Sequence, residues 1–148
     1  MMEFFEQSAF VTAVLAWFIA QAIKVVTVLI TEKKFDFSRF VGSGGMPSSH
    51  SAFVTGLATA VGFSCGFLSE LFSVSAVLAL IVMYDAAGVR RAAGEQAKIL
   101  NILIEEWGSQ NYKNTEVRLK ELLGHTPMQV IAGAMLGIAI AIFRHLGM

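Results

Sequence analysis

Long apolar segments alternate with short polar ones along the chain. Four apolar segments are long enough, or nearly so, to cross the hydrocarbon core of a bilayer, which takes about 20 helical residues. They run from Phe10 to Ile30, His50 to Leu68, Ser73 to Val89, and Pro127 to Phe143. With two prolines and no low-complexity stretch, nothing marks a linker. The pattern predicts an all-α polytopic membrane bundle of about four transmembrane helices, forming a single integral membrane domain over residues 1–148.

The one sizeable polar region, residues 90–124, lies between the third and fourth apolar segments. We expect it to continue the third helix and then to form a short amphipathic helix from Glu116 to Leu123. Glu116 and Lys120 make a favourable pair four residues apart, and Gly124 can end this helix.

Composition agrees with a membrane location. Of the 148 residues, 55% are hydrophobic and only 15% are charged, whereas about a quarter of the residues in a soluble domain are charged. The formal net charge is zero, so charge gives no support for nucleic-acid binding, and no nucleic-acid partner is expected. The single Cys65 cannot form an intrachain disulfide and is interpreted as a packing residue.

The placement of basic residues predicts an orientation. The second connection, near Glu70, has no Lys or Arg, whereas the first and third connections are basic. Their basic residues are Lys33, Lys34, Arg39, Arg90, Arg91, Lys98, Lys113, Arg118 and Lys120. Basic connections stay on the cytoplasmic side of a membrane, so both termini are expected outside the cell. The protein is expected in the cell membrane.

Two polar strings with a histidine each stand directly before apolar segments, and both fall on the predicted cytoplasmic side. They are Gly44 to His50 and Gly124 to Pro127. Helix starts carry N–H groups without intrahelical partners and the positive end of the helix dipole, so they favour an anion such as phosphate. Ser48 and Ser49 add hydroxyl groups. The alternative is that glycine and serine only form a turn and a helix cap.

At the second string, the residues Thr126-Pro127-Met128-Gln129 predict a capping box with proline at the first helical position. Gln129 therefore has a structural role available. If the second and fourth helices are neighbours, His50 and His125 face one polar mouth, where one histidine can attack and the other can protonate a leaving oxygen. The alternative for each is a histidine in a loop or at the membrane interface. No matched set of cysteines or carboxylates accompanies them, so neither a metal nor a cofactor is expected.

These strings resemble motifs of the type 2 phosphatidic acid phosphatase superfamily. Pro47-Ser48-Ser49-His50 is similar to its Pro-Ser-Gly-His motif, and the segment starting at His125 is similar to its His-x-x-x-Asp motif. Together with Tyr84 to Arg91, they look most like the divergent branch of that superfamily. The resemblance implies that His125 is the nucleophile that forms a phosphohistidine, that His50 is the general acid, and that the Ser48 and Ser49 amides help to cradle the phosphate.

The chain departs from the superfamily pattern at three places, one of them Leu119 where the third motif has an arginine, and other residues can compensate. Gln129 stands where the third motif has aspartate, and Arg39 belongs to a broken form of the first motif, with Phe40 in place of its proline. Asp85, near the cytoplasmic end of the third helix, can supply the missing carboxylate.

Substrate binding is predicted for Arg39, Ser48, Ser49, Arg90, Arg91 and Gln129. Arg90 and Arg91 can act as a phosphate clamp. The alternative makes them ordinary membrane anchors, with Arg91 paired to Glu95. Lys24, in the first apolar segment, either snorkels to the interface or serves the site.

Two functions remain open. The first is a membrane phosphatase-like hydrolase that cleaves a lipid-linked phosphate monoester or pyrophosphate through a phosphohistidine; a lipid is expected because the mouth lies at the bilayer surface. The alternative is a catalytically degenerate membrane protein that binds a phosphorylated lipid headgroup or acts as an assembly partner. Gly133 and Gly137, four residues apart, favour close helix packing or a homo-oligomer.

Overall fold

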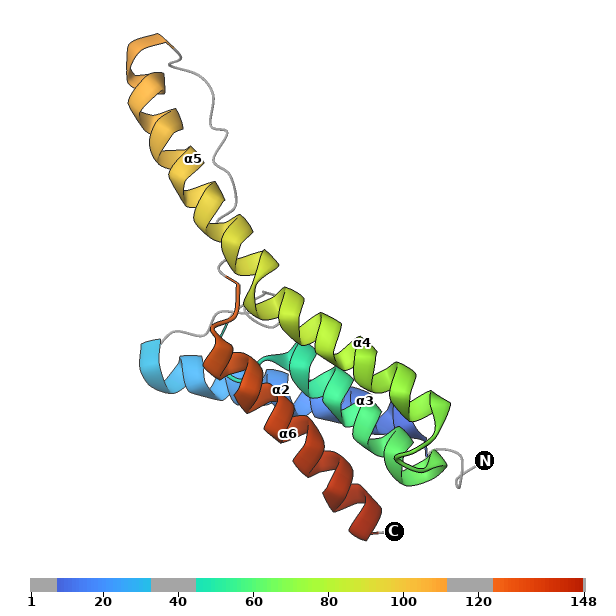
Figure 1. Cartoon of the computed structure of the whole chain (residues 1–148). Coiled ribbons are helices and arrows are strands. Elements are labelled where there is room, and N and C mark those ends of the chain that lie inside the picture. The colour runs from blue at the N-terminus through green and yellow to red at the C-terminus, as the bar shows by residue number, and fades with distance from the viewer. Residues whose placement is uncertain (1–7, 33–44, 112–123, 148) are drawn as a thin grey trace.

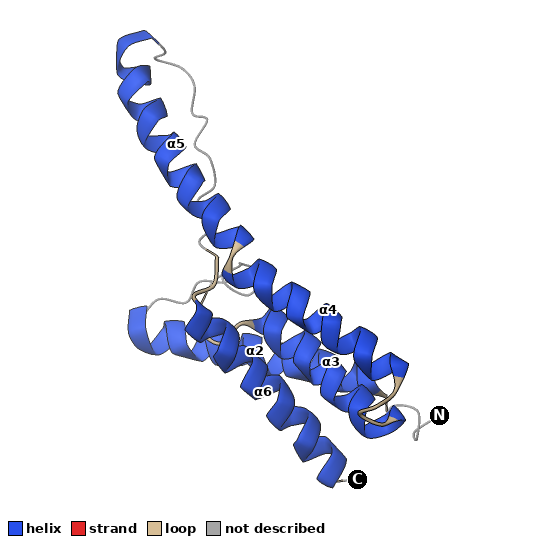
Figure 2. Cartoon of the chain, viewed as in Figure 1, coloured by secondary structure: helices blue, strands red, loops and turns tan. Residues whose placement is uncertain are grey.

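A computed structural model of the chain describes residues 8–32, 45–111 and 124–147. Within these ranges the regular elements are all helices (Figure 2). They are α2 (Ala9–Glu32), α3 (Ser49–Cys65), α4 (Glu70–Ala87), α5 (Val89–Asn111) and α6 (Pro127–Leu146). The predicted all-α membrane bundle is confirmed.

The helix α3 lies at the centre of the bundle and packs against α2, α4 and α6, while α2 also contacts α6. Figure 1 shows the start of α2 and the end of α6 at one end of the bundle. The starts of α3 and α6 lie together with the end of α4 at the other end (Figure 1). The second and fourth apolar segments are therefore neighbours, and the polar strings that precede them meet at one end of the bundle.

Side-chain size is distributed as expected for helices that face lipid. Small residues fill the interior, where Ala13, Ala16, Ala20 and Ala52 are fully buried. Large apolar side chains point outward, among them Phe18, Leu71, Leu80, Met135 and Phe143. Close helix approach through small residues is the usual packing mode in a bilayer, where lipid tails solvate the large ones.

Three segments of the described chain are long and apolar enough to cross a membrane: Ala9–Thr27, Glu70–Ile104 and Pro127–Leu146. The remaining predicted span, His50 to Leu68, corresponds to α3, which has only 17 residues. At 1.5 Å per residue such a helix is about 25 Å long, slightly shorter than the hydrocarbon core of about 30 Å. Its central position reduces its own contact with lipid.

The predicted continuation of the third helix is α5, which follows α4 after a turn at Gly88 and extends beyond the bundle (Figure 1). The predicted amphipathic helix from Glu116 to Leu123 lies outside the described residues.

The crossing of α3 and α6 is unusually close because of two glycines on α6. A Cβ atom added at Gly133 would overlap the Ser48 carbonyl, and one added at Gly137 would overlap the Ala52 carbonyl. At the same crossing, Thr55 Oγ1 lies 3.1 Å from the Ala134 carbonyl oxygen, to which it donates a hydrogen bond. These glycines pack within the chain and hold the starts of both helices together.

Candidate functional site

The start of α3 is fixed by serine hydroxyl groups. Ser48 is the N-cap, and its Oγ accepts hydrogen bonds from the Ser51 backbone N–H at 3.3 Å and from the Ser51 hydroxyl at 3.0 Å. The Ser48 backbone N–H donates to the Gln129 carbonyl oxygen at 2.9 Å. The first turn of α3 is therefore hydrogen-bonded directly to the first turn of α6.

The start of α6 is the predicted capping box. Thr126 is the N-cap and Pro127 follows it as the first helical residue. The Gln129 backbone N–H donates to Thr126 Oγ1 at 3.4 Å, and the Thr126 backbone N–H donates to Gln129 Oε1 at 3.0 Å. The amino-acid sequence alone predicts this capping box because all of its hydrogen bonds are local.

The Gln129 amide oxygen also contacts the ring of His125. Its Oε1 lies 3.3 Å from His125 Nδ1. A backbone N–H can only donate, so the bond from Thr126 requires the oxygen end of the Gln129 amide at this corner. An oxygen beside Nδ1 makes a hydrogen bond when Nδ1 carries the proton. In a neutral imidazole, the lone pair then lies on Nε2.

The structure brings the two predicted catalytic histidines together. His50 lies in the first turn of α3 and is exposed, whereas His125 is only 3% exposed. Their ring centroids are 6.4 Å apart and the ring planes are inclined by 59°. The His125 backbone N–H donates to the Ala86 carbonyl oxygen at 3.1 Å, so the end of α4 also holds this loop.

The side chain of Lys24 on α2 reaches the first turn of α3. It is 3% exposed, and its Nζ donates a hydrogen bond to Ser49 Oγ at 3.0 Å. Its aliphatic stem passes Gly45, which has a φ of 87° and so favours glycine. Within the described ranges, no carboxylate forms an ion pair with Lys24. Because Lys24 and Ser49 are 25 residues apart in the chain, a local sequence pattern does not predict this contact.

Of the remaining predicted site residues, three lie on α4 and α5. Asp85 is half-buried in the last turn of α4, directly before Ala86. Arg90 lies in the first turn of α5. Arg91 is exposed and pairs with Glu95 at 3.4 Å, as the alternative interpretation predicted. Arg39 lies outside the described residues.

The charge available to a ligand comes from side chains and helix starts. In the part of the chain that the structure describes, no three His, Cys, Asp or Glu side chains are grouped so as to hold a metal ion. The site instead combines one lysine and two histidines with the starts of α3 and α6. Positive ends of helix dipoles and a buried cation attract an anion in a low-dielectric setting.

Comparison with known proteins identifies relatives of the whole chain. The sequence model of the Divergent PAP2 family matches residues 5–140. A protein of Bacillus subtilis (strain 168), named "Uncharacterized membrane protein YuiD", is 41% identical over 151 residues, which cover 95% of this chain and 96% of that protein. No solved structure matches the chain.

Proposed function

Since this chain belongs to the Divergent PAP2 family, we propose that its two histidines hydrolyse a phosphate monoester or pyrophosphate carried by a lipid. His125 Nε2 attacks phosphorus, forming a P–N bond as the P–O bond to the leaving group breaks. His50 protonates the leaving oxygen. Water then attacks the phosphohistidine, giving one proton to His50 and releasing phosphate, which returns both rings to their starting states.

The contact between Gln129 Oε1 and His125 Nδ1 is the main support for a nucleophilic His125. A nucleophilic imidazole must be neutral, with its lone pair on the attacking nitrogen. The amide oxygen favours that tautomer without a carboxylate. It thereby supplies the orientation that an aspartate gives to a catalytic histidine, although not the negative charge.

Lys24 supports the proposal from a different helix. A phosphoryl group entering between the rings brings negative charge, and the Lys24 ammonium beside Ser49 is suited to neutralise it. Arg90, Arg91 and Arg39 remain predicted contributors to this clamp. Asp85 remains a predicted second orienting group near the same loop.

The neutral Gln129 also favours a second candidate, a binding protein that holds a phosphorylated headgroup without turnover. A glutamine does not stabilise an imidazolium by charge, and loss of the corresponding carboxylate is costly in other histidine-dependent enzymes. The orientation proposed for the protein puts this site at the cytoplasmic face of the cell membrane in either case.

The test is to trap the covalent intermediate. Purified protein is incubated with a long-chain alkyl phosphate or lipid pyrophosphate labelled with ³²P and then quenched in base. Acid-labile label should appear on the wild type and be absent from His125→Ala. The matched control is His145→Ala, which should leave labelling intact because His145 lies in the last turn of α6 and stacks on Phe63.

Leaving-group dependence tests the role of His50. In His50→Ala, labelling should be slow with an alkyl phosphate and less affected with an aryl phosphate, whose leaving oxygen needs no proton. Label that persists in His125→Ala would contradict the proposal. Tight binding with neither label nor released phosphate would favour the second candidate.

A further inference from the structure

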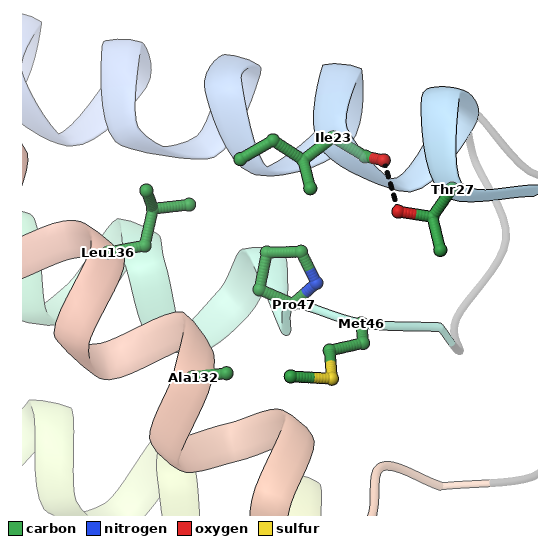
Figure 3. A pocket seen from close by; sticks show the side chains of 6 residues that line it. All are labelled: Ile23, Thr27, Met46, Pro47, Ala132 and Leu136. Carbon is green, nitrogen blue, oxygen red and sulfur yellow. Dashed lines mark hydrogen bonds between the residues drawn. The ribbon is translucent and has the colours of Figure 1, made fainter.

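An apolar pocket of about 360 Å³ lies beside the histidine site, between α2, the segment before α3, and α6. It is lined by Ile23, Thr27, Met46, Pro47, Ala132 and Leu136 (Figure 3). The only hydroxyl among these side chains is that of Thr27, which donates to the Ile23 carbonyl oxygen at 2.8 Å. Thr27 therefore satisfies its own polar group within the helix, and the pocket walls are chemically suited to hydrocarbon.

Each wall of the pocket continues into the polar site within three residues. On α2, Thr27 is one turn from Lys24; before α3, Pro47 is joined to Ser48; on α6, Ala132 is one turn from Gln129. The hydrogen bonds from Lys24 to Ser49 and from Ser48 to Gln129 tie these three walls together at their polar edge. A molecule that occupies both regions must be anionic at one end and apolar at the other.

We propose that this α2–α6 pocket binds the hydrocarbon chain of the substrate, whose phosphate lies at His50, His125 and Lys24. This inference rests on the proposed function and specifies its substrate as an amphiphile that enters from the bilayer between α2 and α6. Two features identify a lipid chain as the occupant. The pocket lies at the end of a membrane-spanning segment, Ala9–Thr27, and its polar edge carries positive charge that complements a phosphate head.

The size of the pocket restricts what it holds. Pockets that enclose a small organic ligand usually measure about 300–1,000 Å³. A volume of 360 Å³ is at the lower end of that range and suits one chain segment near the head, not a complete two-chain lipid. The distal part of the chain then stays in the bilayer, so the phosphate and the first methylenes determine recognition.

The experiment uses the full-length protein in detergent and a photoreactive alkyl phosphate with a diazirine near the phosphate end of its chain. The matched probe is the corresponding alcohol, which has the same chain and no phosphate. Crosslinks from the phosphate probe should map to the peptides that contain Met46 and Leu136 and should be far weaker with the alcohol. Equal labelling by both probes would mean general lipid contact and would overturn the proposal.

Filling the pocket provides the second arm. Ala132→Phe should lower crosslinking at the pocket by at least about tenfold, because it excludes several methylenes from burial. Met46→Trp changes the segment directly before α3 and should have the same effect without changing α6. Ala139→Phe is the control, since Ala139 is exposed on the same helix and does not line the pocket. Unchanged crosslinking in both filled variants would overturn the proposal.

Kinetics separate this proposal from the function on which it rests. The ratio of kcat/KM for a long-chain phosphate to that for a chain-free aryl phosphate should fall in Ala132→Phe and Met46→Trp and stay constant in Ala139→Phe. If the protein hydrolyses both substrates and the ratio is unaffected, the pocket assignment is wrong while the hydrolase proposal stands. If no substrate is hydrolysed, crosslinking still decides the pocket assignment.

Discussion

At the scale of single residues, the chemistry of His125 depends on one amide oxygen. Gln129 Oε1 accepts from the Thr126 backbone and lies 3.3 Å from His125 Nδ1. With histidine labelled with ¹⁵N in the ring, NMR of the purified protein should therefore show His125 with its proton on Nδ1. In Gln129→Leu the oxygen is lost, and the Nε2-protonated tautomer should gain population.

Thr126→Ala separates this tautomer effect from helix capping. It removes the acceptor for the Gln129 backbone N–H but leaves Gln129 Oε1 in place. We expect a loss of about 1 kcal/mol in unfolding free energy with the His125 tautomer unchanged. A wild-type His125 that is already protonated on Nε2 would contradict the assigned role of Gln129.

A charge at position 129 should increase the rate if hydrolysis occurs. Gln129→Glu keeps the length of the side chain and adds the negative charge that the superfamily pattern provides through aspartate. A hydrogen bond to a charged group contributes about 1.5–3 kcal/mol, compared with about 1 kcal/mol for a neutral pair. Phosphohistidine formation, measured by rapid quench, should accelerate by about tenfold; a slower rate would indicate that another carboxylate, such as Asp85, already orients His125.

At the scale of elements, the crossing of α3 and α6 positions the two histidines. Gly133→Ala should force the helices apart, because its Cβ would overlap the backbone carbonyl of Ser48, which cannot rotate away. Overpacking of this kind costs about 1–3 kcal/mol, against a gain of about 1 kcal/mol in helix propensity. The unfolding temperature and the binding of phosphate should both decrease.

The control for this crossing is Ala139→Ser, which also adds one heavy atom to α6 but at an exposed position. It should change neither quantity. If Gly133→Ala is as stable as the wild type and binds phosphate equally well, close approach of α3 and α6 is not what builds the site.

The elements also show which parts of the site the sequence can predict. The caps at Ser48 and Thr126 were predictable because their bonds join residues three apart. The bond between Lys24 and Ser49 was not, since it depends on how α2 packs against α3. Likewise, α3 is shorter than its apolar segment suggested because Gly66 ends it, with a φ of 91°.

At the scale of the whole molecule, the orientation in the membrane remains a prediction from basic residues. In a Cys65→Ser background, a cysteine at Glu70 should react with an impermeant thiol reagent in intact cells. A cysteine at Lys98, which is exposed on α5, should react only after the membrane is permeabilised. The reverse pattern would put the histidine site outside the cell.

Whether His50, His125 and Lys24 form one anion site is tested most directly by the thermal stability of the purified protein as a function of phosphate or vanadate concentration. A ligand that binds only the folded protein stabilises it by RT ln(1 + [L]/Kd), about 2.7 kcal/mol at 100 times Kd. The wild type should gain stability, and Lys24→Met and His125→Ala should lose most of that gain. Lys98→Ala, which removes an exposed lysine on α5, should keep it. No stabilisation of the wild type at tens of millimolar anion, or equal stabilisation of all four proteins, would contradict an anion site formed by these three residues.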